Sequence, residues 1–486
     1  MTSSNTATGV AYTPIQIKRI LILISLIVLS ESLSSTILLP FVYFMVRDFG
    51  IDEDETQIGS RAGFITSSFF LAQMLMTTMW GMISDRWGRR PVLLMGLLGN
   101  TISLTLFGTS SNLFYAILFR SCCGILNGNI AVARTSVGEL AVRANLDQAK
   151  AFSLFGFCSA LGFVVGPLIG GSLSNPARLG IEGPNQIFVH FPYLLPCIAG
   201  AAVSAVTFIS SIFFLNETNE AVWKQSEIFP EPEVDDERQP LLSTPTPAYD
   251  GNTPILEDGI EEKAKIEPTA FWCIFCASIM CLHSIIFDEL FPLFAAASSD
   301  GNVGLGYTAS QIASALSLMG IVIFFAQLVL YPLLNVRFNT LSLWRVSTAS
   351  FVFIYPLFPL IPGLARSGYL VQKAVILVCM ASRFTAIVIA YTSINILMNN
   401  STTAESRGLV NGVAQSFVSF ARSIGPALGG VIWSWSLSNG YGFPFNRFFL
   451  FLLLSVFAIL QFLFSFMIPG RIATKRDTSM AVHAEV

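Results

Sequence analysis

The stretch Gly81-Met82-Ile83-Ser84-Asp85-Arg86-Trp87-Gly88-Arg89-Arg90-Pro91 places four charged side chains between two long apolar runs. Charged side chains are costly in the hydrocarbon of a bilayer, so such a stretch belongs where a membrane-spanning chain turns around at the surface. Its glycines permit a tight turn and a close approach of the flanking helices. The stretch therefore predicts a short loop between two transmembrane helices.

The composition of the whole chain agrees with a membrane protein. Hydrophobic residues make up 53%, charged residues 12%, and the mean hydropathy is +0.65, whereas soluble domains carry about twice this charged fraction. The net charge of −3 gives no reason to expect a nucleic-acid partner. The Gly-Lys dipeptide of a phosphate-binding loop does not occur, which argues against ATP-driven pumping.

The eight cysteines all lie within apolar runs, where they pack as small hydrophobic residues. Cys273 and Cys276 have a spacing that metal sites use, but no second Cys/His pair with ligand spacing accompanies them. Packing on one helix face is the favoured interpretation. No metal ion or other cofactor is therefore expected.

Apolar runs long enough to cross a bilayer, about 20 residues each, occur along most of the chain. The polar segment between the first six runs and the last six is rich in Asp, Glu, Pro, Ser and Thr, cannot bury enough apolar surface to fold, and is expected to be disordered. The candidate spans are 20–46, 62–83, 91–109, 112–133, 151–174, 192–215, 269–297, 309–334, 341–364, 370–398, 408–435 and 445–468. The predicted division is a tail 1–19, a six-helix bundle 20–215, a linker 216–268, a second bundle 269–468 and a tail 469–486.

The distribution of basic residues predicts the orientation. The first apolar run follows Lys18-Arg19 and extends to Val46, which is too long for the core of a cleavable signal peptide, so it is a first transmembrane helix. Most of the 27 lysines and arginines fall in the two tails, the linker and every second loop. Because positively charged loops stay in the cytoplasm, both termini and the linker are predicted to be cytoplasmic.

The two bundles repeat each other in sequence. Arg120 of the fourth span matches Arg383 of the tenth, and the run Gly166-Pro167-x-x-Gly170-Gly171 matches Gly425-Pro426-x-x-Gly429-Gly430. Glu31-Ser32 of the first span pairs in the same way with His283-Ser284 of the seventh. Parallel repeats of this kind are typical of membrane transporters built from two six-helix halves.

The loop at 81–91 resembles the cytoplasmic loop signature of the major facilitator superfamily of transporters, Gly-x-x-x-Asp-Arg-x-Gly-Arg-Arg, at every fixed position. The resemblance covers both bundles and implies an all-α membrane protein with the major facilitator fold, 12 transmembrane helices in two pseudo-symmetric six-helix bundles.

The loop at 81–91 would then be a conformational latch, whose arginines pair with carboxylates across the seam between the halves. The alternative is an anchor that only fixes the orientation of the protein in the membrane. The corresponding C-half loop has Asn335 where Asp85 would repeat, which degrades any latch there. The latch residues are Gly81, Asp85, Arg86, Gly88, Arg89 and Arg90.

The fifth span carries a motif that resembles the one typical of proton-coupled antiporters in this superfamily. Small residues on one face let helices approach closely, and a proline bends the helix. Glycine-mediated packing is the alternative interpretation, and antiport is implied by the resemblance alone. The motif residues are Gly162, Gly166, Pro167, Gly170 and Gly171.

Glu31 lies about eleven residues into the first span, near mid-bilayer at about 1.5 Å per residue. A low-dielectric cavity favours the uncharged form of a carboxyl group, so Glu31 is the first candidate for a site that alternately binds a proton or the substrate. Its repeat mate His283 is expected at similar depth, where it would share protons, contact substrate, or simply be a packed histidine. Arg120 resembles the span-four arginine of the family and needs a partner or a wet cavity.

Asp288 and Glu289 are neighbours, about 100° apart on a helix, so they cannot both face the centre of a cavity, and one of them is expected to pair with a basic residue. The same geometry argues against a zinc site formed with His283. Arg383 and Arg422 lie well inside the tenth and eleventh spans. These side chains predict a cavity of mixed sign, which suits an anionic or zwitterionic solute.

The linker segment Glu237-Arg238-Gln239-Pro240-Leu241-Leu242 matches an acidic dileucine sorting signal, although short motifs also arise by chance. If it functions, Glu237, Leu241 and Leu242 would bind a clathrin adaptor and direct the protein to a vacuolar or lysosomal membrane. If it does not, the plasma membrane is the alternative location.

The chain is most similar in pattern to the twelve-span drug:proton antiporter group, and within it to the zinc-induced facilitator-like branch, on Glu31-Ser32 and the Asp288–Pro292 stretch. That resemblance implies alternating access by a monomer that exports a small organic solute, such as a metal chelator or organic ion, in exchange for protons. A proton-independent facilitator and a solute-sensing membrane receptor remain alternatives. No catalytic constellation is found, so an enzyme is not expected.

Overall fold

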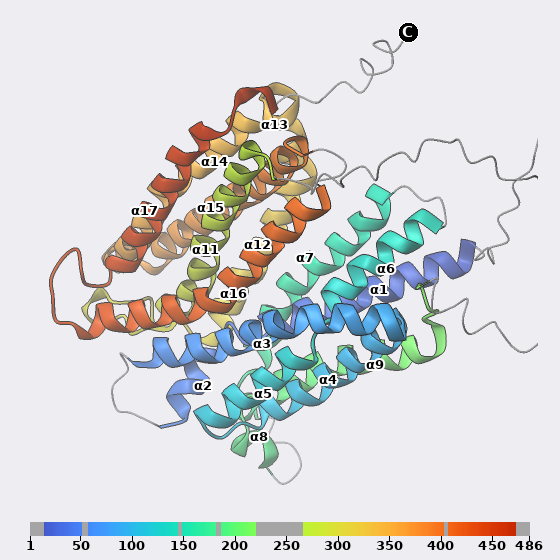
Figure 1. Ribbon diagram of the computed structural model, residues 1–486. Coiled ribbons are helices and arrows are strands. Elements are labelled where there is room, and N and C mark those ends of the chain that lie inside the picture. Colours follow the sequence, from blue (N-terminus) through green and yellow to red (C-terminus); the bar gives the residue numbers. More distant parts are fainter. Residues whose placement is uncertain are drawn as a thin grey trace, which may run out of the picture.

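The computed structural model describes residues 14–50, 57–143, 148–180, 186–219, 266–402 and 407–472. In these ranges the chain is helical and has no β-strand (Figure 1). The proposed sorting signal at Glu237, Leu241 and Leu242 lies outside the described residues.

The helices of the N half follow the first six predicted spans. The fourth span consists of two helices, α5 and α6, and the first is followed by a turn and the short helix α2. The bounds are α1 Pro14–Thr36, α2 Val42–Asp48, α3 Ile58–Trp87, α4 Arg89–Gly108, α5 Leu113–Leu126, α6 Asn129–Arg143, α7 Gln148–Leu173, η2 Pro176–Leu179, α8 Ile187–His190 and α9 Leu194–Phe214.

The helices of the C half follow the last six predicted spans. Its second span contains a π-helical segment, η5, directly before Pro332, which has no N–H to donate to the preceding turn. The bounds are α11 Pro268–Ala296, η4 Asp300–Asn302, α12 Ala309–Phe325, η5 Ala326–Leu330, α13 Tyr331–Arg337, α14 Thr340–Ile354, η6 Tyr355–Ser367, α15 Tyr369–Asn400, α16 Arg407–Ser438, α17 Phe449–Phe464, η7 Ser465–Met467 and η8 Gly470–Ile472.

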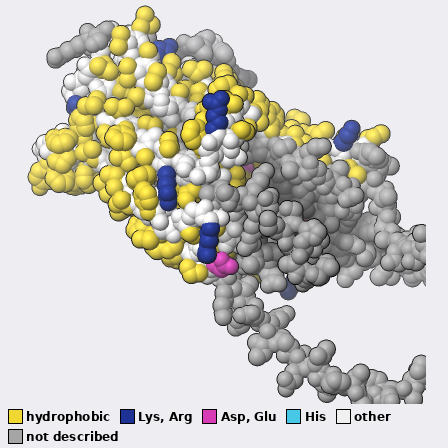
Figure 2. All heavy atoms as spheres, turned by 90° about the horizontal axis from the view of Figure 1, so that it is seen from above, with side chains coloured by type: hydrophobic (Ala, Val, Ile, Leu, Met, Phe, Trp, Pro, Cys, Tyr) yellow, Lys and Arg dark blue, Asp and Glu magenta, His cyan; other side chains and the backbone are white. Residues whose placement is uncertain are grey.

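Ten helical segments of the described chain are long and apolar enough to cross a membrane. Helices α1 and α16 are not among the ten, but they pack along α7 and α3 within the same assembly. With them the number of spans would reach twelve, and that number stays a prediction. Hydrophobic side chains cover most of the coloured surface in Figure 2, interrupted by few charges, as expected of a surface in contact with lipid.

The two halves form separate bundles that meet at one end and diverge at the other (Figure 1). The seam between them joins α3 to α16 and α7 to α12. Residues 14 and 472, where the described chain begins and ends, lie at the diverging end. We call this the open end and the opposite one the closed end.

Small residues bring α3 and α16 into contact at the closed end. A Cβ atom on Gly59 would lie 2.9 Å from Cδ1 of Trp433, and one on Gly63 would overlap the backbone of Pro426. The backbone N–H of Ser60 donates to Oγ of Ser434 at 2.8 Å. Helices can approach this closely only where side chains are small.

The glycine motif of α7 serves two surfaces at once. Cβ atoms on Gly162, Gly166 and Gly170 would overlap residues 32–37 at the end of α1 and in the turn after it, whereas one on Gly171 would overlap α12 across the seam. The repeated motif in α16 behaves in the same way. There Gly425 and Gly429 face α11 of their own half, and Gly430 faces α3 of the other half. The structure thus confirms the internal repeat, because equivalent glycines occupy equivalent contacts.

A bulkier residue at Gly170 should destabilise the protein because its Cβ would overlap the backbone of Ile37. Gly170→Val should lower the free energy of unfolding by about 1–3 kcal/mol, as overpacking does. Gly156→Val in the same helix is the control, because nothing lies within 4 Å of its Cβ position. Thermal unfolding of the purified variants in detergent measures both effects, and equal losses would contradict the packing assigned to the motif.

Candidate functional site

Glu31 of α1 lies enclosed among polar side chains of its own half. Its residue surface is 3% exposed. Nε2 of Gln73, on α3, donates to Oε1 at 2.9 Å. The amide nitrogen of Asn127, when it faces Glu31, donates to Oε2 at 2.8 Å and to Oε1 at 3.0 Å. The carboxyl group is therefore held by neutral amide donors.

The fourth span breaks beside Glu31, a feature that the sequence analysis missed. Helix α5 ends at Leu126 and α6 begins at Asn129, and the backbone N–H of Ile130 in the first turn of α6 donates to Glu31. Nε1 of Trp80 donates to the carbonyl of Ile125 at 2.7 Å, which satisfies a group freed by the break. The break turns a helix N-terminus, which favours negative charge, toward the Glu31 carboxyl group. The run Asn127-Gly128-Asn129 was the available signal in the sequence.

Arg120 of α5 is fully enclosed in the N half. Its guanidinium lies between the rings of Phe69 at 4.6 Å and Phe107 at 5.6 Å, and Nη1 donates to the carbonyl of Ser34 at 3.2 Å. Nε and Nη2 have no hydrogen-bond partner in the part of the chain that the structure describes. The charge of Glu289 acts on Arg120, and the two side chains form no ion pair in the described residues.

Arg383 of α15 repeats this arrangement in the C half, with an acid added. Its Nη2 donates to the carbonyl of Ser284 at 3.0 Å and to Oγ of Ser284 at 2.7 Å. The guanidinium lies 4.7 Å from the rings of Phe287 and Phe384. In addition, Nη2 lies 2.9 Å from Oδ1 of Asp288. The two arginines therefore occupy equivalent places, but only the C-half arginine has a carboxylate partner in the described structure.

Asp288 and Glu289 take different surroundings, as the sequence predicted. The side chain of Asp288 is 45% exposed and pairs with Arg383. Glu289 is 3% exposed and lies within hydrogen-bond distance of Thr66, on α3 of the other half, with Oγ1 and Oε1 3.1 Å apart. Asp288 is thus the member that pairs with a basic residue, which the sequence alone left open.

His283 is a packed histidine in the interior of the C half. Its Nδ1 lies 2.7 Å from the hydroxyl of Tyr355, and its Nε2 lies 2.7 Å from Oε1 of Gln461. Since Oε1 can only accept, Nε2 carries a proton, and both ring nitrogens are occupied. This matches the packing alternative from the sequence.

Glu31 and His283, which match in the sequence repeat, have different hydrogen-bond partners in the structure. The equivalent polar cluster of the N half is centred on Ser34, where Asn100 donates to the hydroxyls of Ser34 and Ser204 at 2.8 Å. In both halves the first, third and sixth spans supply the cluster. Glu31 lies outside this cluster, almost one helical turn before Ser34.

Arg422 of α16 completes a group of charges between the halves. It is partly exposed, and its charge acts on both Glu31 of the N half and Asp288 of the C half. We call Glu31, Asp288, Arg383 and Arg422 the central charged cluster. It combines two acids with two arginines, the mixed sign that the sequence predicted.

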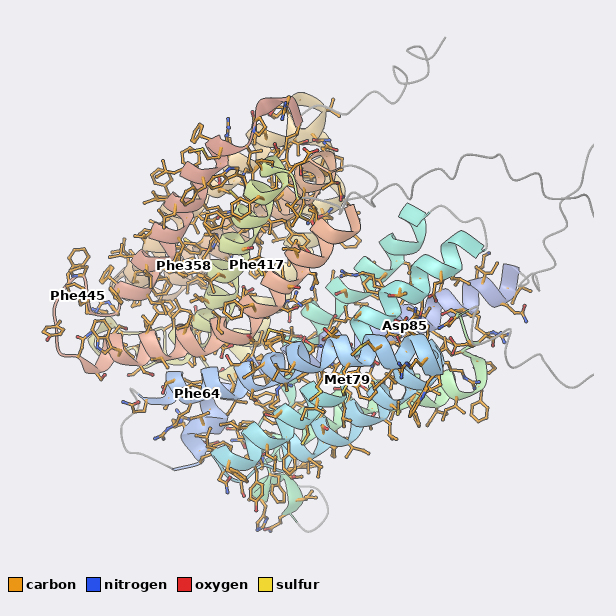
Figure 3. All side chains as sticks on the ribbon, in the orientation of Figure 1. Phe64, Met79, Asp85, Phe358, Phe417 and Phe445 are labelled. Atoms are coloured by element: carbon orange, nitrogen blue, oxygen red, sulfur yellow. The ribbon has the colours of Figure 1, made fainter. Side chains whose placement is uncertain are left out.

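The loop at 81–91 forms its ion pairs within the N half. Nη1 of Arg89 lies 2.6 Å from Oδ1 of Asp85, and Nη2 of Arg89 lies 2.9 Å from Oε1 of Glu139 on α6. The side chain of Asp85 is 65% exposed. Asp85 and Met79 lie on the end of α3 that extends past the seam, and the loop follows that end (Figure 3). In the part of the chain that the structure describes, no ion pair of this loop crosses the seam, because the halves are apart at the open end.

Residues 216–219, at the beginning of the predicted linker, are bound to this loop. The carboxylate of Glu217 accepts from the backbone N–H groups of Arg89 at 2.8 Å and Arg90 at 3.0 Å, and so caps α4. Nδ2 of Asn219 donates to the carbonyl of Asp85 at 3.0 Å. The boundary predicted from composition therefore begins a few residues too early, because composition does not show a tertiary helix cap.

Comparison with known proteins adds a family and a fold. The family model of the Major Facilitator Superfamily matches residues 24–426. The chain is 32% identical to the major facilitator superfamily multidrug transporter mfsB of Aspergillus fumigatus, over 87% of this chain and 79% of that protein. It is 31% identical to the protein ZINC INDUCED FACILITATOR-LIKE 1 of Arabidopsis thaliana, over 85% of this chain and 83% of that protein.

Two solved structures have the same fold at low sequence identity. A D-xylose-proton symporter matches with a TM-score of 0.67 at 13% identity, over 94% of this chain and 99% of that chain. The human organic anion transporter MFSD10 matches with a TM-score of 0.55 at 18% identity, over 93% of this chain and 100% of that chain.

Proposed function

This chain belongs to the major facilitator superfamily, and we propose that it exchanges a small organic solute for protons by alternating access. Members of the superfamily are multi-pass membrane proteins and transporters, so the chain is a secondary transporter and not an enzyme. The exchange for protons, the class of solute and the residues that carry them are the proposal.

The observation that carries proton exchange is the enclosure of the Glu31 carboxyl group, whose residue is 3% exposed. Glu31 belongs to the N half and Arg422 to the C half, and the charge of the arginine acts on the acid between the bundles. Enclosure favours the neutral acid, whereas the arginine favours the carboxylate. A rocking motion of the halves changes the distance between them, so it couples protonation of Glu31 to the conformation of the protein.

The conformation described here, with the bundles apart at the end that carries the termini, corresponds to a cytoplasm-facing state if the termini are cytoplasmic. In the opposite state the open end must close, which would bring the loop at 81–91 against the C half. The exposed carboxylate of Asp85 supports a latch of that kind, because its Oδ1 pairs with Arg89 here and its second oxygen could accept from backbone N–H groups at the beginning of a facing helix.

The central charged cluster supports an anionic or zwitterionic solute. Arg422 is partly exposed between the halves, and its charge acts on Asp288, whose side chain is 45% exposed. A carboxylate on the solute could bind Arg422, while an ammonium group could bind Asp288. The names of relatives, a multidrug transporter and a zinc-induced facilitator-like protein, agree with small organic solutes.

The cellular setting follows from the sequence. We place the protein in a vacuolar, lysosomal or plasma membrane, with both termini in the cytoplasm, acting as a monomer. A clathrin adaptor would bind the linker at Leu241-Leu242.

Glu31→Gln should abolish solute uptake driven by an imposed pH gradient in proteoliposomes, because the amide cannot exchange a proton. Solute-for-solute exchange without a gradient should persist, which shows that the variant is folded. Glu267→Gln, at an exposed acid preceding α11, is the matched control and should transport like the unmodified protein. Proton-driven uptake that survives in Glu31→Gln would refute the role of Glu31.

Arg422→Gln should discriminate between solutes by charge. Loss of a charge-assisted hydrogen bond of about 1.5–3 kcal/mol predicts at least about a tenfold loss of iminodiacetate uptake. Uptake of the cation tetraphenylphosphonium, if the protein carries it, should not fall. The uptake of both radiolabelled probes measures the ratio, and an equal loss for both, or no loss for iminodiacetate, would contradict an anion-binding role.

Asp85→Asn should slow solute exchange without weakening solute binding, because the latch acts on the conformational change and not on the central charged cluster. Rates of exchange in proteoliposomes and equilibrium binding to the purified protein separate the two effects. Arg61→Gln, a charge removal at the closed end of the same helix, is the comparison. An unchanged exchange rate in Asp85→Asn would count against the latch.

A further inference from the structure

A second enclosed carboxyl group, Glu289, lies in the seam between the halves. We propose that Glu289 is a proton-binding site at the closed end, and that the seam closes over its protonated form. The inference goes beyond the function proposed above, because it requires only that the two halves alternate. It does not depend on Glu31 or on the identity of the solute.

The hydrogen-bond pattern at Thr66 carries the proposal. Oγ1 of Thr66 lies 3.2 Å from the carbonyl of Ala62, one turn earlier on α3, and 3.1 Å from Oε1 of Glu289. A hydroxyl has one proton and can donate it fully to one acceptor. If Thr66 donates to Ala62, the contact with Glu289 is satisfied only when the carboxyl group carries a proton and donates it to Thr66. Protonated Glu289, Thr66 and the carbonyl of Ala62 then form a complete chain.

Among the described residues, no cation is in contact with the Glu289 carboxyl group. The charged and titratable side chains that act on it from the packed helices are Arg120 and Asp288. Asp288 is engaged with Arg383 at 2.9 Å, and Arg120 forms no ion pair with Glu289 in the described residues. An ionised carboxylate with one neutral hydroxyl beside it has a large desolvation cost. Binding of a proton removes that cost.

The contacts around Glu289 explain why its protonation is linked to the seam. The backbone N–H of Ala427 donates to Oγ of Ser67 at 2.8 Å, next to Thr66 in sequence, and Gly63 packs against Pro426. These contacts join the N half to the C half, so Thr66 and Glu289 separate when the halves part. The carboxyl group then meets the solution at the closed end of the protein and can ionise.

The proton therefore comes from the solution on that side. It forms an O–H bond at the Glu289 carboxyl group before the seam closes, and it returns to the same solution when the seam parts. The closed seam binds one proton more than the parted seam. By linkage, the form that binds more protons is favoured as pH falls, so a low pH on that side keeps the seam closed.

Spin labels at the ends of α3 and α16 test the proposal directly. Gln57 and Ser438 flank the seam at its closed end, and the two cysteines that are not buried, Cys122 and Cys281, are replaced by serine. Double electron–electron resonance in lipid nanodiscs then measures the distance between the labels from about pH 5 to about pH 9. We expect short distances at low pH and a growing population of long distances as pH rises.

Glu289→Gln should keep the distance short over the whole range, because the amide is neutral and can still donate to Thr66. A Glu289→Gln variant that titrates like the unmodified protein would overturn the proposal, as would an unmodified protein whose distance does not change with pH. Should Glu289→Gln fail to fold, Thr66→Val serves instead and should shift the opening of the seam to lower pH; an unshifted opening would overturn the proposal.

Ser67→Ala is the matched control, since it removes a seam hydrogen bond without a titratable partner. It should favour long distances at every pH while keeping the pH dependence, and loss of the pH dependence would show that Glu289 is not its source.

The same measurement in Glu31→Gln separates this inference from the proposed function. The pH dependence of the seam should persist there even though proton-driven uptake is lost.

Discussion

Charged side chains inside a bilayer must find hydrogen-bond partners within the protein, and the interior of this chain is organised by that requirement. Arg120 and Arg383 each lie between aromatic rings and donate to a serine carbonyl of the first helix of their half. Glu31 accepts from the amides of Gln73 and Asn127. Each charge thus ties several helices together, so the groups that fix the packing are also the ones that respond to a proton or a solute.

The two halves share a scaffold but not their acids. Equivalent glycines of α7 and α16 pack against the first helix of their own half and against the opposite half, which lets the helices approach closely on both sides of each glycine motif. The acids break this symmetry, since Glu31 lies only in the N half, whereas Asp288 and Glu289 follow Ser284 in the C half. A motion that preserves the scaffold therefore changes the distances between unlike charges, and this couples conformation to protonation in the proposed mechanism.

Hydrophobic runs predicted the helices well because a span must be apolar along its whole length. For the same reason, a charged residue within such a run was easy to recognise as a candidate site residue. The break at Asn127-Gly128 was missed because a single polar pair does not interrupt an apolar run. His283 was matched with Glu31 because the alignment of the two spans contained no gap, and the alignment does not show that the two side chains have different hydrogen-bond partners. Contacts such as Glu217 with α4 join residues far apart in sequence and have no local signal.

The central claim is that transport of solute is coupled to an opposite movement of protons through Glu31. The most direct measurement uses proteoliposomes loaded with solute and diluted into solute-free medium, with a pH-sensitive dye inside. We expect the lumen to become acidic with the unmodified protein, because protons enter as solute leaves, and to keep its pH with Glu31→Gln. Exit of solute without acidification, or equal acidification with the variant, would contradict the claim.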